Sequence, residues 1–134
     1  HQLKFSNSLT YTYGQIVNDP GRYPLDHISP LFGRSSIDLQ IKKFKSSFFL
    51  VFNGDKKSKH YNLSGEDNEY FSVDPINGFM PNWMTLNLNT SYSINKKIQI
   101  QLSFDNILDT NYRQFASNIS AGGRNISFAL KGSF

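Results

Sequence analysis

Apolar and polar residues alternate over several stretches of this chain. The most regular stretch is 98–105, in which the alternating positions are Ile98, Ile100, Leu102 and Phe104 on one side and Gln99, Gln101, Ser103 and Asp105 on the other. Successive side chains of a β-strand point to opposite faces, so the pattern predicts a strand with one apolar and one polar face. A face this polar does not suit a globular core, but it suits a strand that lies between lipid and water.

The same alternation predicts an all-β fold made of about six antiparallel strands. We expect the strands over residues 3–14, 36–42, 48–52, 83–94, 98–105 and 124–134. Tight turns near Lys45 and Ser46 and at 95–97 join two pairs of strands. The other connections, 18–30, 54–82 and 109–123, are long and rich in turn-forming residues. The prolines of 18–30 argue against a regular strand within that segment.

Long and short connections therefore alternate along the chain. In an antiparallel meander this places tight turns at one rim and long loops at the other, as in transmembrane β-barrels with periplasmic turns and extracellular loops. We expect the first strand to rise from the periplasmic rim and the loops around Pro20, Glu66 and Ala116 to lie outside. An upper aromatic girdle would then contain Tyr11, Tyr13 and Trp83, and Phe134 would lie at the lower rim. A soluble β-sandwich is the competing interpretation.

The stretch 48–52 is the exception to this alternation. It is apolar on both faces, with Phe49 and Val51 at the positions that should face the barrel interior. We expect these two side chains to press against another domain inside the barrel.

Composition narrows the possibilities further. The chain has 134 residues, 38% hydrophobic, 15% aromatic and 18% charged, with no cysteine. This length allows one domain and favours part of a larger barrel, and no apolar run approaches the roughly eighteen residues of a spanning helix. The net charge of +4 comes partly from lysines in predicted turns and loops: Lys42, Lys43, Lys45, Lys56, Lys57, Lys59, Lys96 and Lys97. Solvated lysines explain this charge better than a nucleic-acid groove does, so we expect no nucleic-acid partner.

The region 83–134 carries a set of specific motifs. They are Trp83 with Thr85-Leu86-Asn87, then Asn106-Ile107-Leu108-Asp109, Tyr112-Arg113, Phe115-Ala116-Ser117, Gly123-Arg124-Asn125 and the terminal Phe134. These residues resemble the C-terminal end of a TonB-dependent outer-membrane receptor, of the branch common in Bacteroidetes-like bacteria. Segments 24–30 and 65–68 resemble loop motifs of the same branch. The chain departs from the pattern at Gly122, where the family often has Pro.

The resemblance implies a barrel of roughly twenty-two strands, too wide for side chains to fill and therefore closed by a plug. This chain would supply the last six or so strands, whereas the plug and the TonB-contacting segment would lie N-terminal to His1. The implied partners are outer-membrane lipid, the plug and remaining strands, the TonB complex, and the barrel-assembly machinery that reads the last strand and Phe134. The implied function is import of a scarce, bulky solute, with a ferric siderophore or haem favoured over cobalamin or an oligosaccharide.

Two groups of site residues follow. The family motif and barrel assembly are assigned to Asn106, Asp109, Tyr112, Gly123, Arg124 and Phe134. In this motif Asn106 and Asp109 can end the strand through side-chain bonds to the backbone. The pair Gly122-Gly123 allows positive φ where the loop folds back into the last strand. Simple strand termination explains both features as well as a ligand role does. A solute vestibule is assigned to aromatic and cationic loop side chains, which suit bulky chelates: His60, Tyr61, Tyr70, Phe71, Tyr112, Arg113 and Phe115. Mutual packing of these aromatic residues is the alternative.

Other chemistry finds little support. His27 and His60 lie in different loops without metal-ligand spacing, although His60 beside Tyr61 could serve as an axial haem ligand. The acidic stretch at Glu66, Asp67 and Glu69 suits a solvated loop better than a cation site. No nucleophile elbow, phosphate loop or paired-carboxylate pattern occurs, so we expect no enzyme activity and no cofactor. A soluble carbohydrate- or protein-binding module remains the alternative function.

Overall fold

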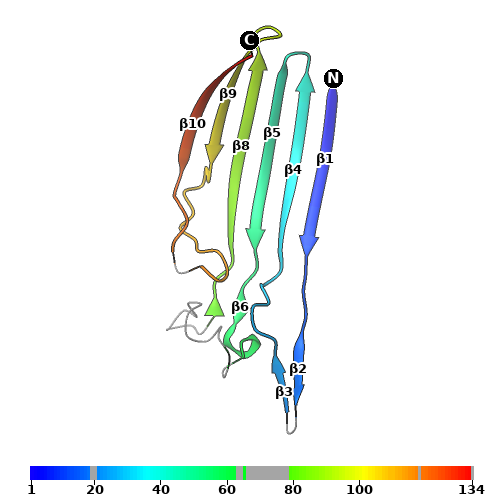
Figure 1. Ribbon diagram of the computed structural model, residues 1–134, viewed down its shortest axis with the longest axis vertical. Coiled ribbons are helices and arrows are strands. Elements are labelled where there is room, and N and C mark those ends of the chain that lie inside the picture. Colours follow the sequence, from blue (N-terminus) through cyan, green and yellow to red (C-terminus); the bar gives the residue numbers. More distant parts are fainter. Residues whose placement is uncertain (19–20, 63–64, 66–78, 118, 134) are drawn as a thin grey trace.

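The computed structural model describes residues 1–18, 21–62, 65, 79–117 and 119–133. Its main feature is one antiparallel sheet of six strands, shown in Figure 1. The strands, in their order across the sheet, are β1 (Gln2–Thr10), β4 (Phe32–Ile41), β5 (Phe44–Asn53), β8 (Trp83–Ser93), β9 (Ile98–Asp105) and β10 (Asn125–Gly132). Strands that neighbour one another in this sheet also follow one another in the chain, so the predicted meander is confirmed.

In the middle of the sheet, the registers place like residues side by side across all six strands. One cross-strand row is apolar throughout: Phe5, Ile37, Phe48, Leu88, Phe104 and Ile126. The neighbouring row is polar throughout: Lys4, Asp38, Ser47, Asn89, Ser103 and Ser127. A shift of one residue in any strand would move its side chains to the opposite face, so the alternation in sequence fixes these registers.

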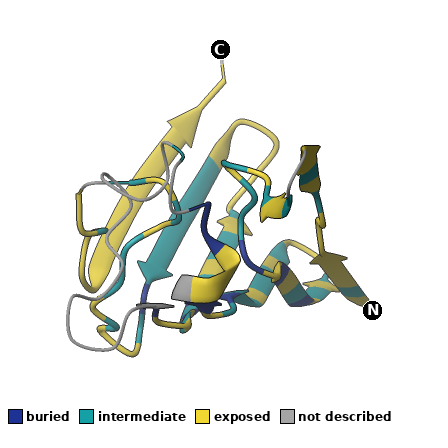
Figure 2. Cartoon of the chain, turned by 90° about the horizontal axis from the view of Figure 1, so that it is seen from below, coloured by how far each residue is buried: buried dark blue, intermediate teal, exposed yellow. Residues whose placement is uncertain are grey.

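The apolar face of the sheet is bare. Phe5 is 65% exposed and Phe128 is 69% exposed, and among the described residues only Tyr61 and Met80 are buried hydrophobic side chains. Figure 2 views the molecule from the loop end and shows the main sheet as one curved layer. Among the described residues no second sheet covers it, because the two further sheets have two strands each and lie beyond its end (Figure 1). The two packed layers of a soluble β-sandwich are therefore not found here.

The short connections lie at the end of the sheet where both termini lie (Figure 1). Ile41 pairs with Phe44, so Lys42 and Lys43 form the first turn, with Lys42 at a φ of 52°. The prediction of this turn near Lys45 and Ser46 is wrong, because these two residues pair with Gln40 and Leu39 in the ladder of β4 and β5. The second turn lies where it was predicted, and the Asn95 side-chain oxygen accepts backbone hydrogen bonds at 2.8 and 2.9 Å.

The long connections lie at the opposite end and contain secondary structure of their own. They hold β2 (Gln15–Asn18) paired with β3 (Gly21–Pro24), β6 (Lys56–Lys57) paired with β7 (Phe79–Met80), and the 3-10 helix η1 (Ser58–His60). The expectation that prolines exclude a strand from 18–30 is wrong, because Pro24 ends β3, which pairs with β2 alone. The first strand also ends earlier than predicted, since pairing with β4 stops at Thr10.

Among the described residues, no helix is long and apolar enough to cross a membrane.

Candidate functional site

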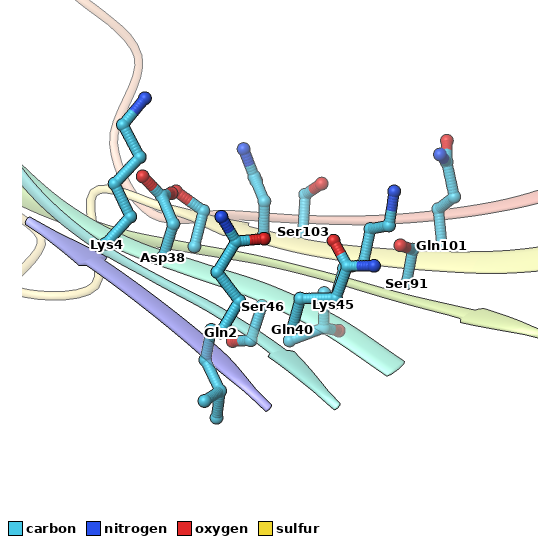
Figure 3. A pocket seen from close by; sticks show the side chains of 13 residues that line it. Gln2, Lys4, Asp38, Gln40, Lys45, Ser46, Ser91, Gln101 and Ser103 are labelled. Atoms are coloured by element: carbon cyan, nitrogen blue, oxygen red, sulfur yellow. The ribbon is translucent and has the colours of Figure 1, made fainter. Parts of the chain in front are cut away.

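The polar face of the sheet forms an open groove near the short-turn end. Its volume is about 530 Å³, and its lining comes from β1, β4, β5, β8 and β9. Figure 3 shows the side chains of Lys4, Asp38, Gln40, Lys45 and Gln101 rising from the sheet on one side. The many amide, hydroxyl and ammonium groups that line the groove favour contact with water and also suit polar contacts with a neighbouring domain.

Closer to the loops, the same face becomes buried and partly apolar. Thr85 and Asn87 are buried, and the Asn87 side-chain nitrogen donates to the Thr85 hydroxyl over 3.1 Å. Phe49 shares this face, and the Arg34 guanidinium lies 4.3 Å from the centre of its ring. The side chains of Phe49 and Val51 are half-buried by other residues of this chain. Their contact with another domain inside the barrel stays a prediction.

The motif residue Asn106 ends β9 through an organised set of bonds. Its φ of 49° lies in the left-handed region that Asn tolerates, and its backbone N–H donates to the Asn87 side-chain oxygen over 2.9 Å. Its side chain donates to the Thr110 carbonyl and accepts from the Thr110 N–H, both over 2.9 Å. Asn106 is buried, so these bonds satisfy groups that have no access to water.

Asp109 and Arg124 join the last long loop to the start of β10. The Asp109 carboxylate accepts from the Arg124 backbone N–H over 2.8 Å, and the Arg124 Nε donates to the Ile107 carbonyl over 2.9 Å. The predicted positive φ at Gly122 and Gly123 is wrong, because neither residue lies in that region. A Cβ at Gly123 would lie 2.8 Å from the Asp109 carboxylate oxygen, so a larger residue there would require the Asp109 side chain to shift.

Tyr112 and Arg113 belong to the same loop, and their contacts lie within that loop and at the loop end of β8. The Tyr112 ring lies 4.2 Å from that of Trp83, tilted by 34°, at the loop end of β8. Arg113 pairs with Ser120 in an isolated bridge, and Tyr112 accepts from the Ala121 N–H over 2.9 Å. These contacts give the loop a local hairpin-like frame.

Tyr61 and Phe115 do come together, around a lysine that sequence reasoning assigned to a solvated loop. The Lys56 ammonium lies 4.3 Å from the Tyr61 ring centre and 4.6 Å from that of Phe115. Lys56 is only 4% exposed, so its assignment as a solvated lysine is wrong. No local sequence signal marks it, because Phe115 is remote in the chain.

His60 is exposed and lines a cavity of about 320 Å³ at the loop end. Three segments form this cavity, which are residues 11–15, 24–31 and 55–60. Tyr11, Leu25 and Leu31 supply apolar surface, and Lys59 supplies a cation. Asp55 also lines the cavity and supplies a carboxylate. Cavities of a few hundred Å³ that combine apolar walls with polar groups are typical of small-molecule sites.

Several predicted residues lie outside the described residues. They are Tyr70 and Phe71 of the vestibule, Glu66, Asp67 and Glu69 of the acidic stretch, and the terminal Phe134. Among the residues that the structure describes, no group of His, Asp or Glu side chains is arranged to hold a metal ion.

The geometry defines a class of structure: a single curved antiparallel wall, apolar on one face and polar on the other, with one short-turn rim and one long-loop rim. This is the architecture of a segment of a large β-barrel, and within this chain the barrel is not closed. No model of a known protein family matches the chain, and no curated protein matches it in sequence.

Solved structures match this chain over almost its full length. It is similar to the copper transporter OprC, with a TM-score of 0.74 and 18% identity over 98% of this chain and 21% of that one. It is also similar to the ferric enterobactin receptor PfeA from Pseudomonas aeruginosa, with a TM-score of 0.64 and 18% identity over 98% of this chain and 20% of that one. A structure of PfeA in complex with BCV-L6 gives 0.69 and 20% identity over the same shares of the two chains.

The predicted fold, an antiparallel segment of a large β-barrel, is therefore confirmed. The chain spans only about a fifth of the length of these structures.

Proposed function

We propose that this chain forms part of the barrel wall of a TonB-dependent receptor in the bacterial outer membrane, and that this receptor imports a scarce, bulky solute. The observation that carries the proposal is the bare apolar face, on which residues such as Phe5 and Phe128 remain mostly exposed. Burial in hydrocarbon stabilises such a face, whereas water does not. The polar face opposite suits a wet lumen.

The free edges of the sheet call for partners. In the described residues β1 pairs with β4 alone and β10 pairs with β9 alone. Backbone groups cannot stay unpaired in lipid, so both edges need further strands of the same barrel. A barrel of about twenty-two strands also needs a plug in its lumen. The plug, the TonB complex that acts on it and the barrel-assembly machinery are the proposed partners, and neither an enzyme activity nor a nucleic-acid partner forms part of the proposal.

For the solute, we propose a metal chelate, with a ferric siderophore first and haem second. The motif residues Asn106, Asp109 and Arg124 support the siderophore or haem branch common in Bacteroidetes-like bacteria. The similar structures are those of a copper transporter and a ferric enterobactin receptor. The exposed His60 beside a cavity is the candidate haem contact.

Uptake by whole cells tests this proposal. A strain that lacks the full-length protein should lose uptake of radiolabelled iron from one ferric chelate, or growth on haem as the iron source, and the loss should also follow removal of TonB. Unchanged uptake of ferric chelates and haem in the deletion strain would refute the proposed cargo. If haem is the solute, His60→Ala should lower its uptake while Lys57→Ala should not.

Cell fractionation tests the wall itself. The full-length protein should stay with the outer membrane and be released only by detergent. Release of a folded, monomeric protein in buffer would instead support the soluble carbohydrate- or protein-binding module.

A further inference from the structure

Lys56 occupies an unusual position for a lysine in a loop. Its side chain is 4% exposed, and burying an ammonium group is unfavourable unless its charge and its N–H donors are satisfied. The Lys56 Nζ donates to the backbone carbonyl of Ile28 over 2.8 Å. It also lies over the rings of Tyr61 and Phe115, at 4.3 and 4.6 Å from their centres. Cations at these distances are attracted by the ring quadrupoles, most strongly where water is excluded.

These partners come from three different long connections. Ile28 belongs to the connection between β3 and β4, Tyr61 to the one that follows η1, and Phe115 to the one between β9 and β10. Lys56 itself is the first residue of β6. Within the described residues, one ammonium group thus joins three loops that are distant in sequence.

The cavity of about 320 Å³ depends on the same loops. Ile28 and Lys56 both line it, together with Tyr11, Lys59 and His60, whereas Tyr61 and Phe115 do not. Tyr61 is 2% exposed. A side chain this deeply buried supports the loops from behind and has almost no surface to offer a bulky solute.

We propose that Lys56 is a positioning residue that ties the three long loops together and so holds the wall of this cavity, where the solute contacts Tyr11, Lys59 and His60. Tyr61 and Phe115 then act as its aromatic supports and not as solute contacts. The role of the cavity in this inference rests on the proposed function. The tie between the loops rests only on the contacts of Lys56 with Ile28, Tyr61 and Phe115.

Chymotrypsin digestion of intact cells that carry the full-length receptor tests the tie. Lys56→Met keeps most of the apolar stem and removes the charge and the N–H donors. We expect cleavage after Tyr61 or Phe115 to become roughly tenfold faster, because one charged hydrogen bond and two cation–ring contacts are lost. Lys56→Arg should restore much of the protection, and the adjacent exposed Lys57→Met should cleave like the unmodified protein.

A gel run without heating first separates the folded protein from unfolded chains by mobility. Mass spectrometry then locates and counts the fragments of the folded protein only. Cleavage of Lys56→Met at the unmodified rate would overturn the tie. An Arg variant as labile as the Met variant, or a Lys57 variant equally labile, would also overturn it, because the effect would not then belong to the buried charge.

Uptake of iron-labelled enterobactin by the same cells tests the positioning role. For Lys56→Met we expect a KM several-fold higher with little change in maximal rate, and recovery with Lys56→Arg. An unchanged KM in cells whose loops have become labile would overturn the positioning role. If the loops become labile and the unmodified receptor imports neither ferric chelates nor haem, the proposed function fails while the tie remains.

Discussion

At the scale of single residues, the described loops are held by buried polar side chains. Asn106 satisfies both the N–H and the carbonyl of Thr110, and its own N–H is satisfied by Asn87. The sequence predicted that Asn106 and Asp109 end a strand by bonding nearby backbone. Asn106 does so at Thr110, whereas the Asp109 carboxylate accepts from the remote N–H of Arg124. The sequence could not predict the role of Gly123, because that role depends on how closely the Asp109 carboxylate approaches.

Substitution of Asn106 should separate its two contributions. Asn106→Gly removes the side-chain bonds but keeps the left-handed φ, and we expect a loss of about 1–3 kcal/mol in the free energy of unfolding. Asn106→Ala should cost about 1 kcal/mol more, because a Cβ disfavours φ near 49°. The temperature at which the full-length barrel loses its folded gel mobility provides the measurement. Equal midpoints for the Gly and Ala variants would show that backbone strain plays no part here.

At the scale of elements, apolar and polar side chains alternate along each strand, and the registers align residues of the same kind in rows across the strands. Phe48 lies in an apolar row and the preceding Ser47 in a polar row. The two residues therefore offer a matched pair on the same strand, at nearly the same depth in the proposed membrane.

Phe48→Arg should destabilise the full-length barrel by about 2–4 kcal/mol, because a guanidinium near the middle of the bilayer is poorly solvated. Ser47→Arg should have little effect, since it places the same group in the polar groove across from Asp38. The fraction of folded protein in the outer membrane, measured by gel mobility before and after heating, distinguishes the two variants. Similar losses for both would mean that the assigned faces are wrong.

Most of the sheet could be predicted from sequence because its signal is local. The limits of β9, for example, agree with the alternation of 98–105. The small sheet of β6 and β7 could not, because these strands pair across a long stretch of chain and no periodic pattern marks either of them. The buried Lys56 was missed for the same reason: its partners Tyr61 and Phe115 are brought to it only by the folded loops.

At the scale of the whole molecule, the two rims differ in kind. The turns at Lys42 and Asn95 are compact, and the opposite rim carries hairpins, a 3-10 helix and the cavity. If the chain lies in an outer membrane as proposed, the compact rim faces the periplasm and the loop rim faces the exterior.

Cysteine labelling of whole cells tests this orientation in the full-length protein, with the same protein lacking the new cysteine as the control. Ile119→Cys in the last long loop should react with a membrane-impermeant maleimide, because the Ile119 side chain is 78% exposed. Lys96→Cys in the second tight turn should react only after the outer membrane is permeabilised. Labelling of Lys96→Cys in intact cells, with Ile119→Cys protected, would reverse the assigned topology.

The compact turns also bear on how such a protein can change over generations. Since Lys42–Lys43 and Asn95–Lys97 set which residues face each other in their hairpins, the opposite ends of the same strands are free to accept insertions and exchanges without disturbing the alignment of the wall. Selection for a new cargo could then replace one loop after another while the lipid-facing surface is inherited intact.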